Sequence, residues 1–195
     1  MTQHSIPCCN PILISLSNRL KGINLYLIGM MGAGKTTIGH FVAQSLGYRF
    51  FDTDHVVEQA TGQTIPHLFA TAGESEFRQV ETQVLAELST YSRLVVATGG
   101  GIVTQRQNWS YLRHGVVVWL DVPLEELYTR LKKDTHRPLL QASDPFARLQ
   151  LLLQERRPLY SQADVRVVVQ PGESPEQVAT QVLEAIPAVL RSEEA

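Results

Sequence analysis

The stretch GMMGAGKT, residues 29–36, matches the pattern G-x-x-x-x-G-K-[ST] at every fixed position. Residues 23–28 come before it as an apolar run with β-branched and aromatic side chains, which predicts a buried strand. Residues 36–46 follow it and predict a helix closed by Gly47. A strand, a glycine-rich turn and a helix N-terminus together direct backbone N–H groups at a polyphosphate. The stretch therefore predicts a nucleoside triphosphate site, in which Lys35 reaches the β- and γ-phosphates and Thr36 ligates Mg²⁺.

Strands and helices alternate along the chain on the C-terminal side of this stretch. The predicted strands lie at 23–28, 49–51, 94–97, 116–120 and 165–169. The predicted helices lie at 36–46, 54–60, 64–70, 74–88, 124–131 and 145–160, and a last one follows the capping-box residues Ser174 and Gln177. This alternation predicts an α/β fold, a three-layer αβα sandwich with a five-stranded parallel sheet and the phosphate-binding loop (P-loop) after its first strand. The polar motifs follow the strands, where ligands of such sheets bind.

The composition is that of an ordinary globular domain. The chain has 195 residues, of which 44% are hydrophobic and 18% charged, and its formal net charge is −2. These values exclude disorder over most of the chain, and the net charge gives no support to binding of nucleic acid or of an anionic membrane. No apolar run approaches the roughly 18 residues that span a bilayer. The only cysteines, Cys8 and Cys9, are adjacent, which fits a reducing cytoplasm better than a disulfide framework.

The chain divides into three segments on local pattern. Residues 1–22 show no sustained period, and we expect them to form a flexible N-terminal extension. Residues 23–190 are expected to form a single domain, followed by a flexible tail at 191–195. Within the domain, residues 132–143 are polar and basic around Pro138, which predicts a mobile lid that closes over the nucleotide.

Two carboxylates follow the second predicted strand. Asp52 and Asp54 are spaced so that one can hold a metal ion through water while the other accepts a hydrogen bond from an attacking hydroxyl and serves as its base. The alternative is an Asx-turn in which Asp54 caps the next helix. The neighbouring P-loop favours the functional interpretation.

Arginines outnumber lysines by 13 to four, and three of them lie in suggestive positions. Arg78 is placed at the edge of a predicted apolar helix face, where Glu81 at i+3 can orient it; the alternative is a surface ion pair worth under about 1 kcal/mol. Arg137 lies in the lid segment and can act on the transferring phosphoryl group as an arginine finger in cis. Arg156 lies with Arg157 at a helix end, where the helix dipole can account for one of the two.

Three consecutive glycines, Gly99–Gly101, follow the third predicted strand. Three glycines cost backbone entropy, and a tight turn needs only one or two of them. We therefore expect a small substrate to approach the main chain closely at this point, with backbone N–H groups as donors.

Together these motifs resemble those of the shikimate kinase family, within the nucleoside-monophosphate-kinase-like P-loop proteins. The matching pieces are 29–36, Asp52-Thr53-Asp54, Phe77-Arg78 with Glu81, 99–101, Arg137-Pro138-Leu139-Leu140 and Arg156-Arg157-Pro158-Leu159-Tyr160. They follow the family's order from about residue 23 to 189, and no motif position departs from the family pattern. The resemblance implies a monomeric cytoplasmic enzyme with a single kinase domain at 23–190. It implies transfer of the ATP γ-phosphoryl group to the 3-hydroxyl of shikimate, in aromatic amino acid biosynthesis, with one Mg²⁺ per subunit.

The resemblance also implies a role for each matching residue. The residues expected to be catalytic are Lys35, Asp54 and Arg137. The residues expected at the nucleotide are Gly32, Ala33, Gly34, Lys35, Thr36, Thr37, Arg130 on the adenine, Arg137, and Pro175 lining the adenine pocket. The residues expected at shikimate are Asp54, Gly100, Gly101 and, for its carboxylate, Arg78 and Arg156. The residues expected at Mg²⁺ are Thr36, as a ligand, and Asp52, through water.

Three other functions share a P-loop with this one. Another small-molecule kinase, acting on gluconate or a nucleoside monophosphate, is disfavoured by the glycine triplet, the Asp-x-Asp pair and the paired arginines. A non-catalytic nucleotide-binding regulator would be expected to lack Lys35 or Asp54, and both are present. A nucleic-acid-dependent ATPase is disfavoured by the net charge of −2 and by the short chain.

Overall fold

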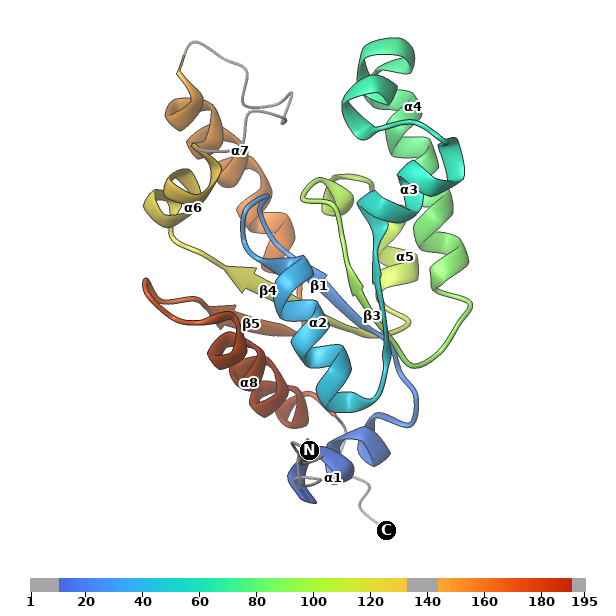
Figure 1. Ribbon diagram of the computed structural model, residues 1–195, viewed down its shortest axis with the longest axis vertical. Helices are drawn as coiled ribbons and strands as arrows, with labels where there is room; N and C mark the ends of the chain where they lie inside the picture. Colours follow the sequence, from blue (N-terminus) through green and yellow to red (C-terminus); the bar gives the residue numbers. More distant parts are fainter. Residues whose placement is uncertain (1–10, 133–143, 191–195) are drawn as a thin grey trace, which may run out of the picture.

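The structure is a computed structural model that describes residues 11–132 and 144–190, and a sheet of five strands lies at its centre (Figure 1). The strands are β1 (Leu25–Ile28), β2 (Arg49–Asp52), β3 (Leu94–Ala97), β4 (Val116–Asp121) and β5 (Val165–Val168). They pair in parallel in the order β2-β3-β1-β4-β5. Every residue of β1, β3 and β4 is buried, as expected of continuous apolar runs in a sheet covered on both faces. The predicted five-stranded parallel sheet is confirmed.

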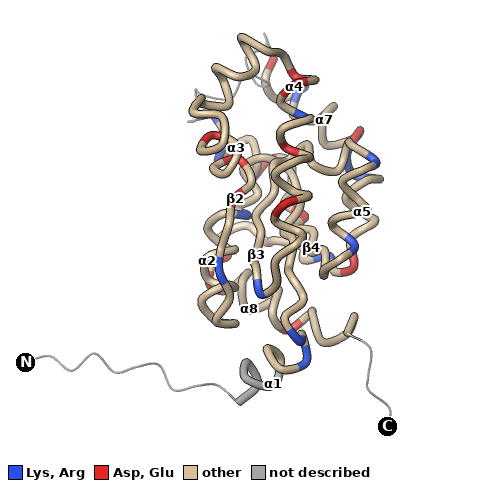
Figure 2. The backbone as a smooth tube through the Cα atoms, turned by 90° about the vertical axis from the view of Figure 1, so that its right-hand side faces the viewer, with Lys and Arg blue, Asp and Glu red and all other residues tan. Residues whose placement is uncertain are grey.

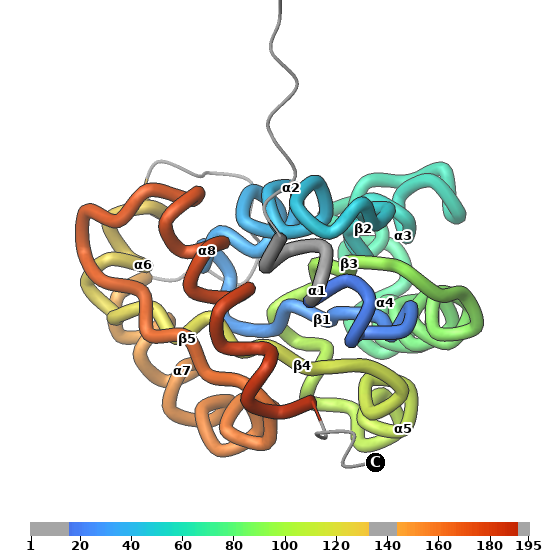
Figure 3. The backbone as a smooth tube through the Cα atoms, turned by 90° about the horizontal axis from the view of Figure 1, so that it is seen from below, coloured from blue at the N-terminus to red at the C-terminus, as the bar shows by residue number. Residues whose placement is uncertain are grey.

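Helices cover both faces of this sheet. They are α1 (Pro11–Leu20), α2 (Lys35–Leu46), α3 (Thr53–Thr61), α4 (Ile65–Leu88), α5 (Asn108–Leu112), α6 (Leu124–Leu131), α7 (Pro145–Tyr160) and α8 (Pro175–Ala185), with 3₁₀ turns η1 (Ile102–Thr104) and η3 (Ile186–Ala188). Helices α2 and α8 pack together on one face, and α4, α5 and α7 lie on the other (Figures 1 and 3). The predicted three-layer αβα sandwich is therefore confirmed. Basic and acidic residues are interspersed along these elements (Figure 2).

The parallel sheet brings the predicted motifs together at the carboxyl-terminal ends of its strands. The carboxyl ends of β1, β2 and β3 lead into the P-loop, into α3 and into the glycine triplet at 99–101. Because β3 pairs with both β1 and β2, these three connections lie side by side. The capping box expected at Ser174 and Gln177 is also present and begins α8.

The N-terminal segment differs from the flexible extension expected over 1–22. Residues Pro11–Leu20 form α1, and the side chains of Leu16 and Leu20 are 3% and 0% exposed in the core. The hydroxyl of Ser17 donates to the carbonyl of Leu46 at the end of α2 (3.3 Å). The i, i+4 spacing of the two leucines is a helical signal, which the nearby prolines and asparagines obscured. Residues 1–10, the predicted lid beyond Lys132 and the tail at 191–195 lie outside the described residues.

Two local features were not predicted. The expected helices at 64–70 and 74–88 belong to one element, α4, interrupted at Gly73, whose φ of 83° and ψ of 171° are non-helical. The segment after the glycine triplet forms η1 and α5, for which the sequence shows no clear period. Among the described residues, no helix is long and apolar enough to cross a membrane.

Candidate active site

The P-loop leaves β1 at Gly29 and enters α2 at Lys35. Gly32 and Gly34 have φ angles of 79° and 88°, which glycine adopts most readily, and Gly34 is the N-cap of α2. The Lys35 side chain is buried, and its Nζ donates to the carbonyl oxygens of Gly29 (2.9 Å) and Met30 (2.8 Å). The ammonium group is thus held inside the loop, beside a helix N-terminus that attracts anions.

A hydroxyl and a carboxylate meet at the start of α2. The Thr36 Oγ1 donates to the Asp52 Oδ2 (2.7 Å), while the Asp52 Oδ1 accepts from the Asp54 backbone N–H (3.0 Å). Asp52, not Asp54, is therefore the N-cap of α3, and the alternative in which Asp54 caps that helix is wrong. Hydroxyl and carboxylate oxygens are the ligands that Mg²⁺ prefers, so this pair fits the ion. No cluster of three or more His, Cys, Asp or Glu side chains suited to a metal occurs within 11–132 and 144–190.

The carboxylates of Asp54 and Glu81 both face Gly99. A Cβ added to Gly99 would lie 2.8 Å from the Asp54 Oδ1 and closer still to the Glu81 Oε1. The Gly99 backbone N–H donates to the Thr53 Oγ1 (2.9 Å), which fixes the start of the triplet beside α3. Only glycine leaves room for both carboxylates here, so the triplet begins where the predicted base lies.

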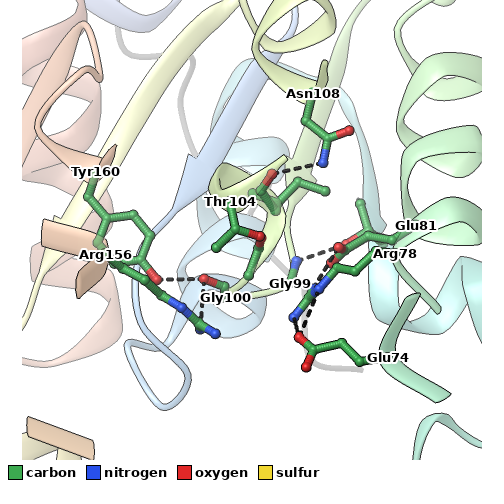
Figure 4. A network of polar contacts seen from close by, with 12 residues as sticks. Glu74, Arg78, Glu81, Gly99, Gly100, Thr104, Asn108, Arg156 and Tyr160 are labelled. Atoms are coloured by element: carbon green, nitrogen blue, oxygen red, sulfur yellow. Dashed lines mark hydrogen bonds and ion pairs between the residues drawn. The ribbon is translucent and has the colours of Figure 1, made fainter. Parts of the chain in front are cut away.

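Arg78 crosses from α4 to the other end of the triplet (Figure 4). Its Nη1 donates to the fully buried Glu81 (2.7 Å), and its Nη2 donates to the more exposed Glu74 (3.1 Å). A Cβ added to Gly101 would collide with the Arg78 guanidinium group. The predicted orientation of Arg78 by Glu81 is present, and the pair is buried, so the alternative of an ordinary surface ion pair is wrong.

Arg156 approaches the triplet from α7, on the opposite side (Figure 4). It is 6% exposed, and its Nη1 donates to the carbonyl oxygen of Gly100 (3.2 Å). The Tyr160 hydroxyl donates to the same oxygen (2.6 Å). Two guanidinium groups, those of Arg78 and Arg156, therefore flank Gly100 and Gly101, and a guanidinium group can bind a carboxylate through two parallel hydrogen bonds.

Burial shapes the charge state of this site. Desolvation raises the pKa of Glu81, and the attraction of Arg78 offsets this only in part. For Arg78, desolvation lowers the pKa, but the charges and hydrogen bonds of Glu81 and Glu74 outweigh it and raise the pKa overall. Burial raises the pKa of Tyr160 to about 12, against the lowering effect of Arg156. The Arg78 guanidinium group and the neutral Tyr160 hydroxyl are therefore stable donors.

Comparison with known proteins identifies the family. The model of the family "Shikimate kinase" matches residues 31–187. The chain belongs to the shikimate kinase family. It is 59% identical over 176 residues to the shikimate kinase of a Nostoc species, with 90% of this chain and 97% of that one covered. It is 53% identical to the shikimate kinase of a Synechococcus elongatus strain, with 92% and 94% covered. A solved structure, shikimate kinase from Acinetobacter baumannii in complex with shikimate, matches with a TM-score of 0.84 and 41% identity, covering 89% of this chain and 97% of that one.

Membership in the shikimate kinase family leaves the individual roles of the site residues as predictions. Arg130 lies beside the P-loop, because its Nη1 donates to the Gly32 carbonyl oxygen (3.4 Å) and its Nε to Glu126 (2.9 Å). Thr37 is exposed on the first turn of α2, and Pro175 is exposed on the first turn of α8, which packs against α2. Arg137 lies outside the described residues.

Sequence reasoning missed two residues of the shikimate kinase site. Thr53, between the two aspartates, holds the Gly99 N–H, and Tyr160 holds the Gly100 carbonyl. The available signal for Tyr160 was its i+4 spacing from Arg156, which places both side chains on one face of a helix. No sequence signal shows that this face meets a carbonyl 60 positions away.

Proposed function

We propose that this site phosphorylates the 3-hydroxyl of shikimate with ATP and Mg²⁺, giving shikimate 3-phosphate and ADP. The observation that carries the proposal is the convergence of Asp54, Arg78 and Arg156 on a glycine triplet beside the P-loop. A ligand with one carboxylate and several hydroxyls needs a guanidinium group to bind its charge and a side-chain carboxylate to accept from its hydroxyls. The carboxyl-terminal ends of these strands supply both.

On the donor side, the residues of the P-loop bind and orient the nucleotide. Lys35 and the backbone N–H groups of 32–37 (Gly32, Ala33, Gly34, Lys35, Thr36 and Thr37) neutralise the phosphates, with Arg130 and Pro175 at the adenine. Thr36 would ligate Mg²⁺ and Asp52 would hold it through water, and the ion would neutralise charge on the phosphates. The lysine hydrogen bonds to Gly29 and Met30 keep its ammonium group in the loop before nucleotide arrives.

On the acceptor side, Asp54 accepts the proton of the attacking hydroxyl. The bond from that oxygen to the γ-phosphorus forms as the bond to the bridging oxygen of ADP breaks, and the hydroxyl proton moves to the Asp54 carboxylate. Arg78 and Arg156 bind the shikimate carboxylate, and the backbone of Gly100 and Gly101 contacts the ring substituents. Catalysis rests on this positioning and charge neutralisation, with Arg137 approaching the transferring group.

The same proposal includes a monomer in the cytoplasm, with no nucleic-acid or membrane partner. A net charge of −2 and the intermixed charges of the described chain support it. Among the described residues, five large hydrophobic side chains are exposed: Leu151 in α7, Val168 in β5, and Ile23, Tyr91 and Val189 in segments outside the helices and strands. Scattered single residues of this kind are normal on a monomer.

The decisive experiment measures ADP release from MgATP with shikimate, against no acceptor, quinate, gluconate and nucleoside monophosphates. We expect turnover with shikimate alone, whereas turnover with another acceptor would reassign Asp54 and the arginines. Lys35→Ala should lose at least about a hundredfold in turnover. Asp54→Asn should abolish transfer yet bind ATP nearly normally in calorimetry, and Glu184→Gln, which neutralises an exposed carboxylate on α8, should change neither. Loss of ATP binding in Asp54→Asn would contradict its role.

A further inference from the structure

Tyr160 is a fully buried tyrosine whose hydroxyl lies at the acceptor site. It is the last residue of α7 and 0% exposed, and its hydroxyl donates to the Gly100 carbonyl oxygen at 2.6 Å. Its ring stacks on that of Trp119 in β4, with centroids 6.0 Å apart. The side chain is thus held by packing along its ring and by a hydrogen bond at its tip.

The Gly100 carbonyl oxygen is the meeting point of two donors from α7. Arg156, one turn before Tyr160, donates to it at 3.2 Å (Figure 4). A carbonyl oxygen has two lone pairs, so these two bonds fix its direction. Because the peptide unit is planar, fixing that C=O also fixes the N–H of Gly101, which points the opposite way. The tyrosine therefore acts on an amide that the proposed function places against shikimate.

The same hydroxyl touches the nucleotide side of the site. The Tyr160 oxygen lies 3.7 Å from the Met30 sulfur in the P-loop. A Cβ added to Gly100 would lie 3.1 Å from the backbone nitrogen of Met31, so the triplet and the P-loop are in direct contact. Tyr160 is therefore packed where the loop for the phosphates meets the loop for the acceptor.

We propose that Tyr160 is a positioning residue for the acceptor, which holds the Gly100–Gly101 peptide so that the Gly101 N–H faces shikimate. The inference rests on the proposed function and adds a residue to it. Without the phenol, Arg156 would be the remaining α7 donor to this carbonyl, and its guanidinium group would have to serve both the peptide and the substrate carboxylate. With a pKa raised by burial to about 12, the hydroxyl keeps its proton at neutral pH and remains a donor.

The test is Tyr160→Phe, which removes one oxygen and keeps the ring that packs on Trp119. We expect the KM for shikimate to rise about tenfold, the size of one lost hydrogen bond at a buried carbonyl, with the KM for MgATP within about twofold and kcat within about threefold. The matched control is Tyr26→Phe. Tyr26 is equally buried, but its ring lies against Gly115, which precedes β4 at the amino-terminal ends of the strands, away from the glycine triplet. Both KM values should therefore stay unchanged in Tyr26→Phe.

The readout separates positioning from general loosening of the fold. KM does not depend on the fraction of active enzyme, so a partly unfolded preparation lowers kcat alone. An unchanged KM for shikimate, or an equal rise of both KM values, would overturn the proposal. Failure of the wild type to turn over shikimate would overturn the proposed function and this inference with it, and it would appear before any variant is compared.

Discussion

Replacing Glu81 should destabilise the protein far more than replacing Glu74, although both carboxylates bind the same guanidinium group. The side chain of Glu81 is 0% exposed, that of Glu74 is 55% exposed, and that of their partner Arg78 is 9% exposed. Removing one partner of a buried pair leaves an uncompensated charge and costs about 3–5 kcal/mol, whereas an exposed pair is worth at most about 1 kcal/mol. Glu81→Ala and Glu74→Ala should therefore differ by several kcal/mol.

An intermediate variant separates the charge from the volume of the side chain. Glu81→Gln fills the same space and keeps one acceptor for the Arg78 Nη1, and its amide N–H₂ can face Asp54. Since desolvation raises the pKa of Glu81, the charged carboxylate is itself costly in this place. We expect Glu81→Gln to lose about 1–3 kcal/mol, between the two alanine variants.

Urea unfolding followed by circular dichroism measures these differences, and shikimate kinetics adds a second readout. For a chain of this length, about 2–4 °C of melting temperature corresponds to 1 kcal/mol, so Glu81→Ala should melt about 6–20 °C lower. The KM for shikimate should rise in Glu81→Ala more than in Glu74→Ala, because Arg78 loses its buried partner. Equal destabilisation by the two alanine variants would refute the argument from burial.

Three further predictions concern Gly101, Tyr160 and Leu20. Gly101→Ala should raise the KM for shikimate in steady-state assays, because the added Cβ collides with the Arg78 guanidinium group. Alanine readily adopts the Gly101 φ of −97°, so backbone strain would not explain the effect. At alkaline pH, Tyr160 binds its proton more tightly in the folded than in the unfolded chain, so its stabilising contribution is complete below pH 10 and is lost as pH rises to about 12. Between pH 9 and 11, urea titrations should therefore show Tyr160→Phe losing about 1 kcal/mol less stability than wild type. Leu20→Ala should cost about 2–5 kcal/mol of stability in urea unfolding, a loss that a flexible segment over 1–22 would not produce.

Much of the fold was predictable because its signals are local. The apolar runs of β1, β3 and β4 and the glycines around the P-loop need no distant partner to be interpreted. The boundary at residue 23 was wrong for a different reason. Helix α1 is short, its leucine pair stands among prolines and asparagines, and it is stabilised by burying Leu16 and Leu20 against elements that the sequence does not reveal.

The types of residue that form the site were predictable from the sequence, but the contacts between them were less so. Asp52 and Asp54 were assigned to a strand end, but which of them caps α3 depends on where β2 stops, a boundary that propensity does not locate within one residue. Glu81 was expected near Arg78, yet it is completely buried beside Gly99, a contact between distant positions that no local pattern predicts. Tyr160 belonged to a matched motif but had no predicted role, because its hydrogen bond to the Gly100 carbonyl joins positions far apart in the sequence.

The glycine triplet explains why the acceptor half of the site depends so strongly on packing. At Gly99 the missing Cβ leaves space for Asp54 and Glu81, at Gly100 for the backbone of Met31, and at Gly101 for the guanidinium group of Arg78. Asp54, the P-loop and Arg78 therefore each lie against a different residue of one short turn. A turn alone would need fewer glycines, so the third follows from the number of functional groups that meet there. Since Tyr160 and Arg156 hold the middle peptide of this turn, small shifts of α7 should change acceptor binding before they change nucleotide binding.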